Sequence, residues 1–235
     1  CLRQFIIDGI FFGAVKLHSG EYFDNSGNVS SEKPSGGYAY YKDGELTLHN
    51  FNFTSDPELV SGERGLYSEI ALEIILEGQN EINTSDSDGI YLLDDLTVSG
   101  GGTLSINVED TYEGIESYGG GMTLKSGTIN INSGDHGIEL SDDFKMEDGI
   151  ININADDDGI DLDGEVQIDG GSITINTEDN GIDAWDDTVI NGGNIYIHTN
   201  DDNGIESYNV TVNGGFIEID ANDDGICGEI SVNIN

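Results

Sequence analysis

The dipeptide Gly-Ile recurs seven times in one register, from Gly89-Ile90 to Gly225-Ile226, at intervals of 21 to 25 residues. A repeat of this length is too short for a pair of helices or a propeller blade, but it matches one turn of a β-solenoid. In residues 165–186, three short runs alternate apolar and polar side chains and are separated by polar turns. The repeat predicts an all-β, single-stranded solenoid, a parallel β-helix of about eight turns with roughly 22 residues per turn.

A second set of glycines repeats just as regularly. Gly127, Gly149, Gly171, Gly193 and Gly215 are each 22 residues apart, which predicts a turn that needs a positive φ or a close backbone approach. The alternation also assigns the inward side chains. These are Val166, Ile168, Ile173, Ile175 and Ile182, with the equivalents Phe144, Met146, Ile195, Ile197, Val210, Val212, Ile217 and Ile219. Stacked turns would join them into aliphatic columns, which no single turn could bury alone.

The repeat weakens toward the N-terminus. Gly65-Leu66 replaces Gly-Ile in an earlier turn, and residues 44–53 match only part of another. Residues 1–43 break the period and are rich in aromatic side chains. We therefore expect an N-terminal cap over 1–43 and a β-helix over 44–235, because solenoid ends expose core and strand edges. Residues 231–235 stop within a turn, which suggests a further domain at the C-terminus or a partner at that edge.

The charge of the chain excludes some classes of partner. Asp and Glu number 47 against 7 Lys and Arg, for a formal net charge of -40. Multivalent cations are expected partners, whereas nucleic acid is not, because phosphate binding needs clustered Lys and Arg. We also expect no membrane insertion, since the first apolar stretch is interrupted at Asp8 and Gly9. Cys1 and Cys227 form no metal-site spacing, and attachment of a lipid to Cys1 has no other support in the sequence.

Acidic residues keep phase with the repeat glycine over many turns. Two residues after it stand Tyr91, Glu116, Glu139, Asp161, Asp183, Glu206 and Cys227. Two residues before it stand Ser87, Tyr112, Asp135, Asp157, Asp179, Asp202 and Asp223. Immediately before it stand Asp88, Glu113, His136, Asp158, Asn180, Asn203 and Asp224. Stacking would turn these positions into columns of carboxylates about 4.8 Å apart.

Neighbouring carboxylates at that spacing repel by about 1 kcal/mol in water and by more near a protein surface. A bridging cation would remove this repulsion, and Ca²⁺ suits hard oxygen donors, whereas the lack of Cys or His clusters argues against zinc and copper. We predict several Ca²⁺ ions as cofactors, with the repeat glycine leaving room between the columns. A solvated acidic face is the alternative. The predicted ligands are Glu116, Asp135, Glu139, Asp157, Asp158, Asp161, Asp179, Asp183, Asp202, Glu206 and Asp223.

Aromatic residues and asparagines occupy further columns. Four residues after the repeat glycine stand Leu93, Tyr118, Ser141, Asp163, Trp185, Tyr208 and Glu229. This column is predicted to point outward beside an acidic one. Because a sugar ring can stack on aromatics beside carboxylates, we predict that Trp185, Tyr208 and Tyr118 bind carbohydrate; ordinary surface aromatics are the alternative. Stacked amides are predicted for the column Asn83, Asn107, Asn132, Asn154 and Asn176, which continues with His198 and Asp220.

The segment K-D-G-E-L-T-L-H-N-F-N-F at residues 42–53, followed by D-G-I turns that alternate with G-G-x-I-x-I turns, resembles a bacterial family of carbohydrate-binding domain proteins. The motif D-D-G-I-D stands at Asp157 to Asp161, and the last copy departs from it at Cys227. The resemblance spans about residues 38–235. It implies a right-handed parallel β-helix, similar in fold to pectate lyases, that binds cellulose or pectic polymers without established catalysis.

These observations predict a non-catalytic, calcium-stabilised protein, extracellular or on the bacterial cell surface, that binds cellulose or pectic polysaccharide. No catalytic residue is assigned. One alternative is a calcium-dependent polysaccharide lyase, which needs a base for proton abstraction. In the repeat region only Lys125 and Lys145, with His136 as the other nearby base, are available for that role. A structural or adhesive stalk is the second alternative.

Overall fold

The structure is a computed structural model that describes residues 9–55 and 64–235. Cys1, and with it the lipid hypothesis, lies outside the described residues, as do residues 2–8 of the predicted cap. The described part of the chain consists of strands and turns without a helix. Accordingly, it contains no helix with the length and apolar character needed to cross a membrane.

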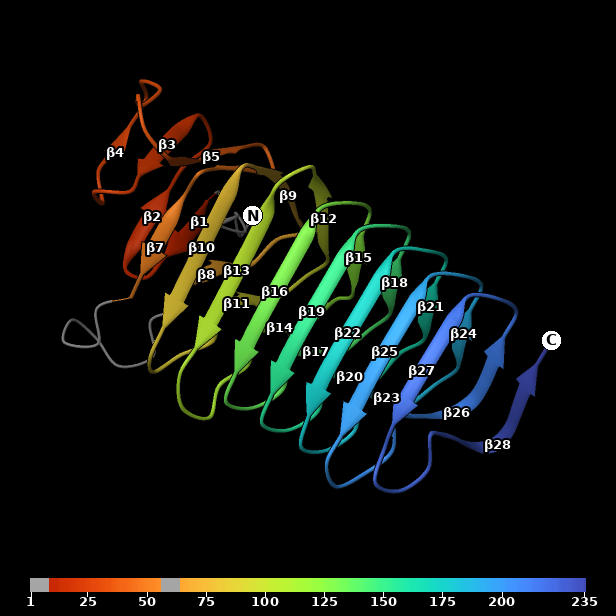
Figure 1. The fold of residues 1–235 in the computed structure, drawn as a ribbon. Helices are drawn as coiled ribbons and strands as arrows, with labels where there is room; N and C mark the ends of the chain where they lie inside the picture. The colour runs from red at the N-terminus through yellow and green to blue at the C-terminus, as the bar shows by residue number, and fades with distance from the viewer. Residues whose placement is uncertain (1–8, 56–63) are drawn as a thin grey trace, which may run out of the picture.

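The predicted parallel β-solenoid is confirmed, with about eight turns of roughly 22 residues. Each complete turn contributes a strand to each of three faces (Figure 1). The first, here the G-I face, is formed by the short strands that follow the repeat glycines. They are β8 (Leu66–Ser68), β11 (Ile90–Leu92), β14 (Ile115–Ser117), β17 (Ile138–Leu140), β20 (Ile160–Leu162), β23 (Ile182–Ala184) and the start of β26 (Ile205–Val212).

The second face, here the middle face, belongs to the same twenty-stranded sheet as the G-I face. Its strands are β6 (Glu45–His49), β9 (Leu72–Glu77), β12 (Leu96–Gly100), β15 (Met122–Leu124), β18 (Phe144–Met146), β21 (Val166–Ile168) and β24 (Thr188–Ile190). In the last turns a single strand runs through both faces, because β26 pairs with both β23 and β24, and β28 (Ile226–Ile234) pairs with β26 along its length.

The third, here the amide face, is a separate eight-stranded parallel sheet whose strands follow one another along the stack (Figure 1). Its strands are β7 (Asn52–Thr54), β10 (Gln79–Thr84), β13 (Thr103–Val108), β16 (Thr128–Ser133), β19 (Ile150–Ala155), β22 (Ser172–Thr177), β25 (Asn194–Thr199) and β27 (Phe216–Asp220). Equivalent residues of successive turns pair directly, as Ile153 does with Ile175 and Ile175 with Ile197.

The core lies between the three faces and is filled by the inward residues of every strand. Ile160, Ile168 and Ile173 are fully buried, as the alternation predicts. Ile217 and Ile219 in β27 point the same way but are only partly buried, because β27 is the edge strand of its sheet. Each residue of an apolar column is therefore buried by its equivalents in the preceding and following turns.

The two sets of glycines have different physical roles. Gly127, Gly149, Gly171, Gly193 and Gly215 all have a positive φ between 81° and 102°, which confirms the predicted turn. The repeat glycines fill a different need.

A Cβ on Gly159 would lie 2.4 Å from Cγ2 of Ile175 and 2.5 Å from the carbonyl oxygen of Gly181. The glycine therefore allows the core and the next turn to approach closely. The expectation that it leaves room for an ion between the acidic columns gave the wrong reason for its presence.

Stacked asparagine side chains hydrogen-bond between turns on the amide face. Asn107 Nδ2 donates to Asn83 Oδ1 at 2.8 Å, and Asn132 Nδ2 donates to Asn107 Oδ1 at 2.8 Å. The ladder continues from Asn154 to Asn132 at 2.9 Å and from Asn176 to Asn154 at 3.2 Å. These residues lie within strands, so they contribute amide stacking rather than turn geometry.

The N-terminal part of the chain packs at one end of the stack (Figure 1). Its strands are β1 (Ile10–Phe12), β2 (Val15–Leu17), β3 (Glu21–Asp24), β4 (Val29–Ser30) and β5 (Tyr38–Lys42). They pair in antiparallel fashion, and β1 also pairs with β8. Phe12 packs against Phe51 and Phe23 with ring centroids 4.9 and 5.5 Å apart. Because β5 also pairs with β6, the boundary between a cap at 1–43 and a β-helix at 44–235 stays a prediction.

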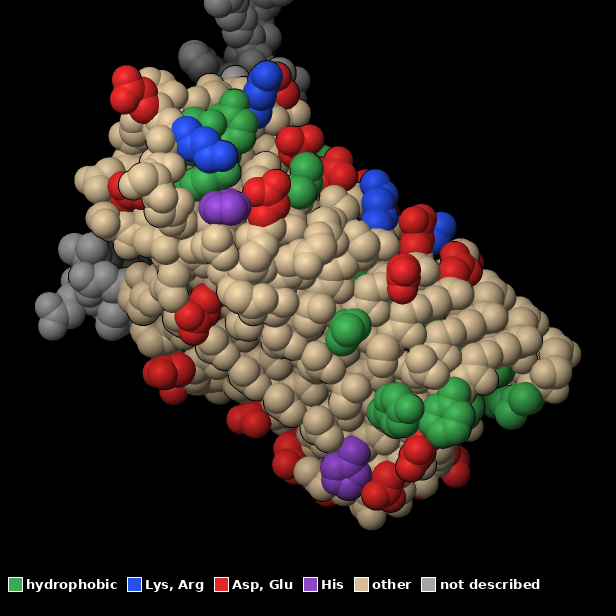
Figure 2. All heavy atoms as spheres, turned by 45° about the horizontal axis from the view of Figure 1, so that its top comes forward, with side chains coloured by type: hydrophobic (Ala, Val, Ile, Leu, Met, Phe, Trp, Pro, Cys, Tyr) green, Lys and Arg blue, Asp and Glu red, His purple; other side chains and the backbone are tan. Residues whose placement is uncertain are grey.

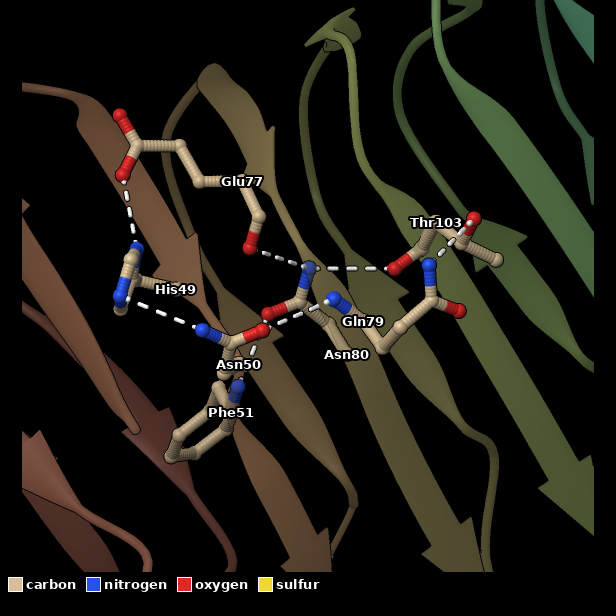
Figure 3. Close-up of polar contacts among 7 residues, drawn as sticks. All are labelled: His49, Asn50, Phe51, Glu77, Gln79, Asn80 and Thr103. Carbon is tan, nitrogen blue, oxygen red and sulfur yellow. Dashed lines mark hydrogen bonds and ion pairs between the residues drawn. The ribbon is translucent and has the colours of Figure 1, made fainter. Parts of the chain in front are cut away.

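Two asparagines join the first partial turn to the turns that follow (Figure 3). Oδ1 of the buried Asn80 accepts the N–H of Phe51 at 2.9 Å, and its Nδ2 donates to the carbonyl of Thr103 at 3.1 Å. Asn50 Oδ1 accepts the N–H of Gln79 at 3.2 Å. These side chains satisfy backbone groups at the corner where the regular stack begins.

The tight approach at the repeat glycine makes a prediction about stability. Gly159→Ala should lower the free energy of unfolding by about 1–3 kcal/mol, because the added methyl group overpacks against Ile175 and the next turn. Gly101→Ala is the matched control, since a Cβ there meets nothing within 4 Å. Chemical denaturation would measure both variants, and equal stabilities would contradict the close packing described for Gly159.

Candidate metal and carbohydrate site

The acidic column that follows the repeat glycine is in register along the G-I face. Glu116 pairs with Glu139, Glu139 with Asp161, and Asp161 with Asp183. Each lies at the centre of a short strand whose two flanking residues point into the core. The alternation therefore directs the carboxylates outward, where they form a continuous column over successive turns.

Carboxylates from adjacent columns converge in several places. Oxygens of Asp157, Asp158 and Asp179 lie within 4.8 Å of one another. A second group of three, near the N-terminal end of the face, consists of Asp88, Glu113 and Glu116. His136 completes two further groups, one with Asp135 and Asp157 and the other with Asp158 and Asp161. Six of the predicted ligands thus lie in clusters that could hold a cation: Glu116, Asp135, Asp157, Asp158, Asp161 and Asp179.

The negative charge of the clustered carboxylates is poorly compensated by the protein. Burial, together with Asp88, raises the pKa of Glu113 to about 8 and that of Glu116 to about 7. Burial raises the pKa of Asp158 to about 7, and burial with neighbouring carboxylates raises that of Asp183 to about 6. The pKa of four more carboxyls is raised for the same first reason, burial: Asp135, Glu139, Asp161 and Asp179. Such groups favour either a proton or a bound cation.

The column immediately before the repeat glycine also has a structural role. Asp158 Oδ1 accepts the N–H of Asn180 at 2.7 Å, and Asn180 Oδ1 accepts that of Asn203 at 3.2 Å. Asn203 Oδ1 in turn accepts the N–H of Asp224 at 3.0 Å. Each side chain thus satisfies a backbone donor of the next turn. Asp158, a predicted metal ligand, therefore uses part of the acceptor capacity of its carboxylate on the backbone of the next turn.

His136 fills one position in this column. Its Nδ1 lies 3.3 Å from the backbone nitrogen of Asp158, and its Nε2 lies 3.9 Å from both Asp135 and Asp157. The imidazole therefore replaces the carboxylate found at this position on the turns before and after it.

Sequence reasoning missed Arg64 as a member of the site. Its Nε lies 3.3 Å from Asp88 Oδ2, and its guanidinium carbon lies 3.5 Å from the centre of the Tyr91 ring. Tyr91 in turn stacks against Tyr67, with ring centroids 6.0 Å apart. Arg64 precedes Gly65 as Asp88 precedes Gly89. Extending the column by one turn toward the N-terminus would have identified it.

The predicted carbohydrate-binding residues lie on the same face and are exposed. The exposed fractions of Trp185 and Tyr118 are 79% and 72%, and that of Tyr208 is 46%. Trp185 and Tyr208 line one depression of about 240 Å³ with Asp183, Glu206 and Glu229. Tyr118 lines a second one, of about 120 Å³, with three members of the acidic column: Glu116, Glu139 and Asp161. The aromatic side chains and the acidic column therefore share their surfaces.

The remaining predicted ligands have other surroundings. Glu206 Oε2 and Asp202 Oδ1 both accept the side-chain N–H groups of Asn203, at 2.7 and 2.9 Å. Asp223 is exposed, and Cys227 stands where its turn would place a carboxylate in the next column. Carboxylate convergence is therefore greatest in the first and central turns of the face.

A family model described as carbohydrate-binding domain-containing protein matches residues 68–235, more than half of the chain. The chain belongs to this family. The matched span contains the clusters of carboxylates and all three exposed aromatic residues of the G-I face. None of the curated protein sequences matches the chain.

Among solved structures, the chain is similar to the polysaccharide lyase-like protein from C. thermocellum, in a gadolinium derivative. The TM-score is 0.61 and the sequence identity is 20%, over 91% of this chain and 95% of that one. At this identity the similarity establishes the fold that the two proteins share.

The raised pKa values make stability depend on pH when divalent ions are absent. The folded state holds protons on these carboxyls to a higher pH than the unfolded chain does. The stability they contribute is complete below the ordinary value of 4.5 for Glu113, and it is lost as the pH rises to about 8. With a chelator present, we expect the melting temperature to fall between these limits. A melting temperature that rose over the same range would contradict the inferred burial.

Proposed function

We propose that this protein is a non-catalytic, extracellular carbohydrate-binding module that binds polysaccharide on the G-I face and is stabilised there by Ca²⁺. One observation carries the proposal: exposed aromatic rings lie beside a column of in-register carboxylates on this face. Trp185 and Tyr208 share a depression with Asp183 and Glu206. A pyranose ring can stack its C–H face on an aromatic side chain while its hydroxyl groups bind carboxylates or a cation.

Ca²⁺ fits the two all-oxygen donor sets better than other metals do. The groups Asp157–Asp158–Asp179 and Asp88–Glu113–Glu116 offer only oxygen ligands, which hard cations prefer. Burial raises the pKa of Glu113 and of Asp158, which indicates charge that the protein does not itself neutralise. The similar protein from C. thermocellum was studied as a gadolinium derivative, and Gd³⁺ is also a hard, oxygen-seeking cation. When bound, Ca²⁺ would link carboxylates of neighbouring turns.

An extracellular or cell-surface location agrees with this chemistry. Calcium sites of extracellular modules bind with dissociation constants of about 10⁻⁴ to 10⁻³ M, so a site built from a few carboxylates is sufficient there. Polysaccharides of the plant cell wall, either cellulose or pectic polymers, are the proposed ligands. A pectic chain carries carboxylates of its own, so its binding to this acidic face would depend on bridging cations.

The positions of the two lysines of the repeat region favour binding over catalysis. Lys145 lies on the middle face in β18, where its Nζ is 3.3 Å from Glu147 and 3.9 Å from Asp169. Lys125 directly follows β15, also on the middle face. Neither is in the acidic column or in the depression beside Trp185.

A calcium-dependent polysaccharide lyase is the second candidate, and Arg64 is the observation that favours it. This residue lies beside the cluster Asp88–Glu113–Glu116, so a basic group and a candidate cation site occur together. Incubation with polygalacturonate and Ca²⁺ separates the functions. Ultraviolet absorbance from unsaturated products, lost in Arg64→Ala, would establish a lyase. Retention on the polymer without product would establish a binding module. If neither result is obtained, the structural or adhesive stalk remains as the explanation.

Removal of calcium tests the proposed metal. At pH 7–8, addition of a chelator should lower the melting temperature by several degrees, because the clustered carboxylates then repel one another without a bridging ion. Titration of the chelated protein with Ca²⁺ should restore the transition. Asp157→Asn with Asp179→Asn should reduce the response to calcium. Identical melting curves with chelator and with Ca²⁺ would remove calcium from the proposal.

Substitution of Trp185 tests the binding surface. Trp185→Ala should weaken binding to insoluble cellulose or to polygalacturonate about tenfold in the presence of Ca²⁺. A sugar ring stacked on the indole buries apolar surface, and the loss of about 1.4 kcal/mol of such burial is a tenfold change in affinity. Stability should change little, since the side chain is 79% exposed. Leu93→Ala is the control, because Leu93 is an exposed side chain at the equivalent position of an earlier turn. Unchanged binding of Trp185→Ala would place the site elsewhere.

A further inference from the structure

The outer side of the amide face carries almost no charge, although the chain contains 47 acidic residues. In the four central strands β13, β16, β19 and β22, every second residue points outward. None of these outward residues is charged; they are Thr103, Ser105, Asn107, Thr128, Asn130, Asn132, Ile150, Asn152, Asn154, Ser172, Thr174 and Asn176. Figure 2 shows this surface as a broad area free of charged side chains, with Asp and Glu around its margins.

The amides on this surface are held in fixed orientations. Asn152 Nδ2 donates to Asn130 Oδ1 at 2.8 Å, beside the longer ladder that includes Asn132 and Asn154. Each such bond uses one N–H hydrogen and one carbonyl lone pair, which leaves the second of each for a ligand. The surface thus presents rows of neutral donors and acceptors about 4.8 Å apart. Because the side chains are already ordered, a ligand would immobilise few rotamers on binding.

An aromatic pair stands at the C-terminal end of these rows. Tyr196 in β25 and Phe216 in β27 have exposed fractions of 41% and 50%, and their ring centroids lie 5.6 Å apart. They occupy outward positions where earlier turns have Thr174 and Asn194. Figure 2 shows hydrophobic side chains gathered at this end of the otherwise polar surface. The core does not require these rings, since both point away from it.

A shallow hollow lies beside Tyr196. Its volume is about 190 Å³, and its lining includes Thr174, Asn176, His198 and Glu218. An aromatic ring, a hydroxyl group and an amide therefore face one space, together with the His198 imidazole and the carboxylates of Glu218 and Asp220. Hydroxyl groups of a ligand could hydrogen-bond these polar atoms while its apolar side packed on the ring.

We propose that the amide face is a second carbohydrate-binding surface, which takes a neutral, linear polysaccharide without a metal ion. The pyranose rings stack on Tyr196 and Phe216, and the chain continues over the rows of amides and hydroxyls. A polyanion is excluded because the surface offers no cluster of Lys or Arg and the whole chain carries a net charge of -40. The proposal extends carbohydrate binding to another face and does not depend on the cation clusters of the G-I face.

The two surfaces can be separated by their need for cations. We would use affinity electrophoresis in a chelator with four soluble neutral polymers: hydroxyethylcellulose, mixed-linkage β-glucan, arabinoxylan and galactomannan. Polygalacturonate serves as the anionic comparison. Circular dichroism at the working temperature confirms that the chelated protein is folded. We expect retardation by at least one neutral polymer and none by polygalacturonate.

Paired variants assign the binding to a face. Tyr196→Ala with Phe216→Ala should weaken the chelator-resistant binding at least tenfold, whereas Leu93→Ala, at an exposed apolar residue of the G-I face, should leave it unchanged. Tyr196→Phe should retain most of it, which separates ring stacking from loss of fold. The melting temperature of the double variant should match the wild type, because both rings are half exposed.

Three results would overturn the proposal. They are no retardation by any neutral polymer in chelator, full binding by the double variant, and self-association in solution that the double variant abolishes. The last would identify the aromatic pair as a contact between protein molecules. Loss of calcium-dependent binding in Trp185→Ala concerns only the G-I face, so the two proposals can fail independently.

Discussion

Parallel, in-register stacking of nearly identical turns is the constraint on which the rest of this structure depends. It places each residue about 4.8 Å from its equivalents in neighbouring turns. For an aliphatic side chain such as Ile175 this is favourable, because each copy buries the one beside it. For an asparagine it is also favourable, since amide donors and acceptors alternate along the column. For a carboxylate the same geometry is unfavourable, because like charges are held together.

The column immediately before the repeat glycine shows how differently successive turns resolve this conflict. Arg64 supplies the protein's own cation at its start, where it pairs with Asp88. His136 interrupts the run of acids in the centre, and Asn180 and Asn203 replace the acid with a neutral acceptor nearer the C-terminus. His136, Asn180 and Asn203 each accept a backbone N–H of the next turn. Arg64 instead has a charged partner. The column that follows the glycine retains its carboxylates, and there an external cation is the proposed solution.

The three-sided cross-section separates two chemistries that the sequence interleaves. Within one turn, an acidic strand of the G-I face is followed about ten residues later by a neutral strand of the amide face. Asp161 and Thr174 are an example, since each pairs with its equivalents along its own sheet. The charged surface and the uncharged surface therefore lie on different sides of one narrow solenoid. Membership of a carbohydrate-binding family is compatible with ligand contact on both.

The period, the parallel stacking, the inward residues and the register of the columns could all be predicted from the amino-acid sequence. This was possible because one repeat unit, read seven times, fixes every position relative to Gly-Ile. The sequence also correctly placed Trp185 beside the acidic column, since alternation assigns faces without knowledge of the fold. The role of the repeat glycine was misjudged, because its contact with Ile175 of another strand is visible only in three dimensions.

Which carboxylates converge, and which also have other partners, depends on contacts that form only in the folded chain. Asp158 belongs to two of the clusters and also accepts the backbone N–H of Asn180. Asp202 accepts the side chain of Asn203 and lies in none of the clusters described above, although it has the same motif position as Asp157 and Asp179. Arg64 and the contact between Tyr196 and Phe216 also emerged from packing, because they lie where the repeat is irregular or where neighbouring columns meet. A periodic sequence specifies columns, but the contacts between columns depend on how the turns bend around the core.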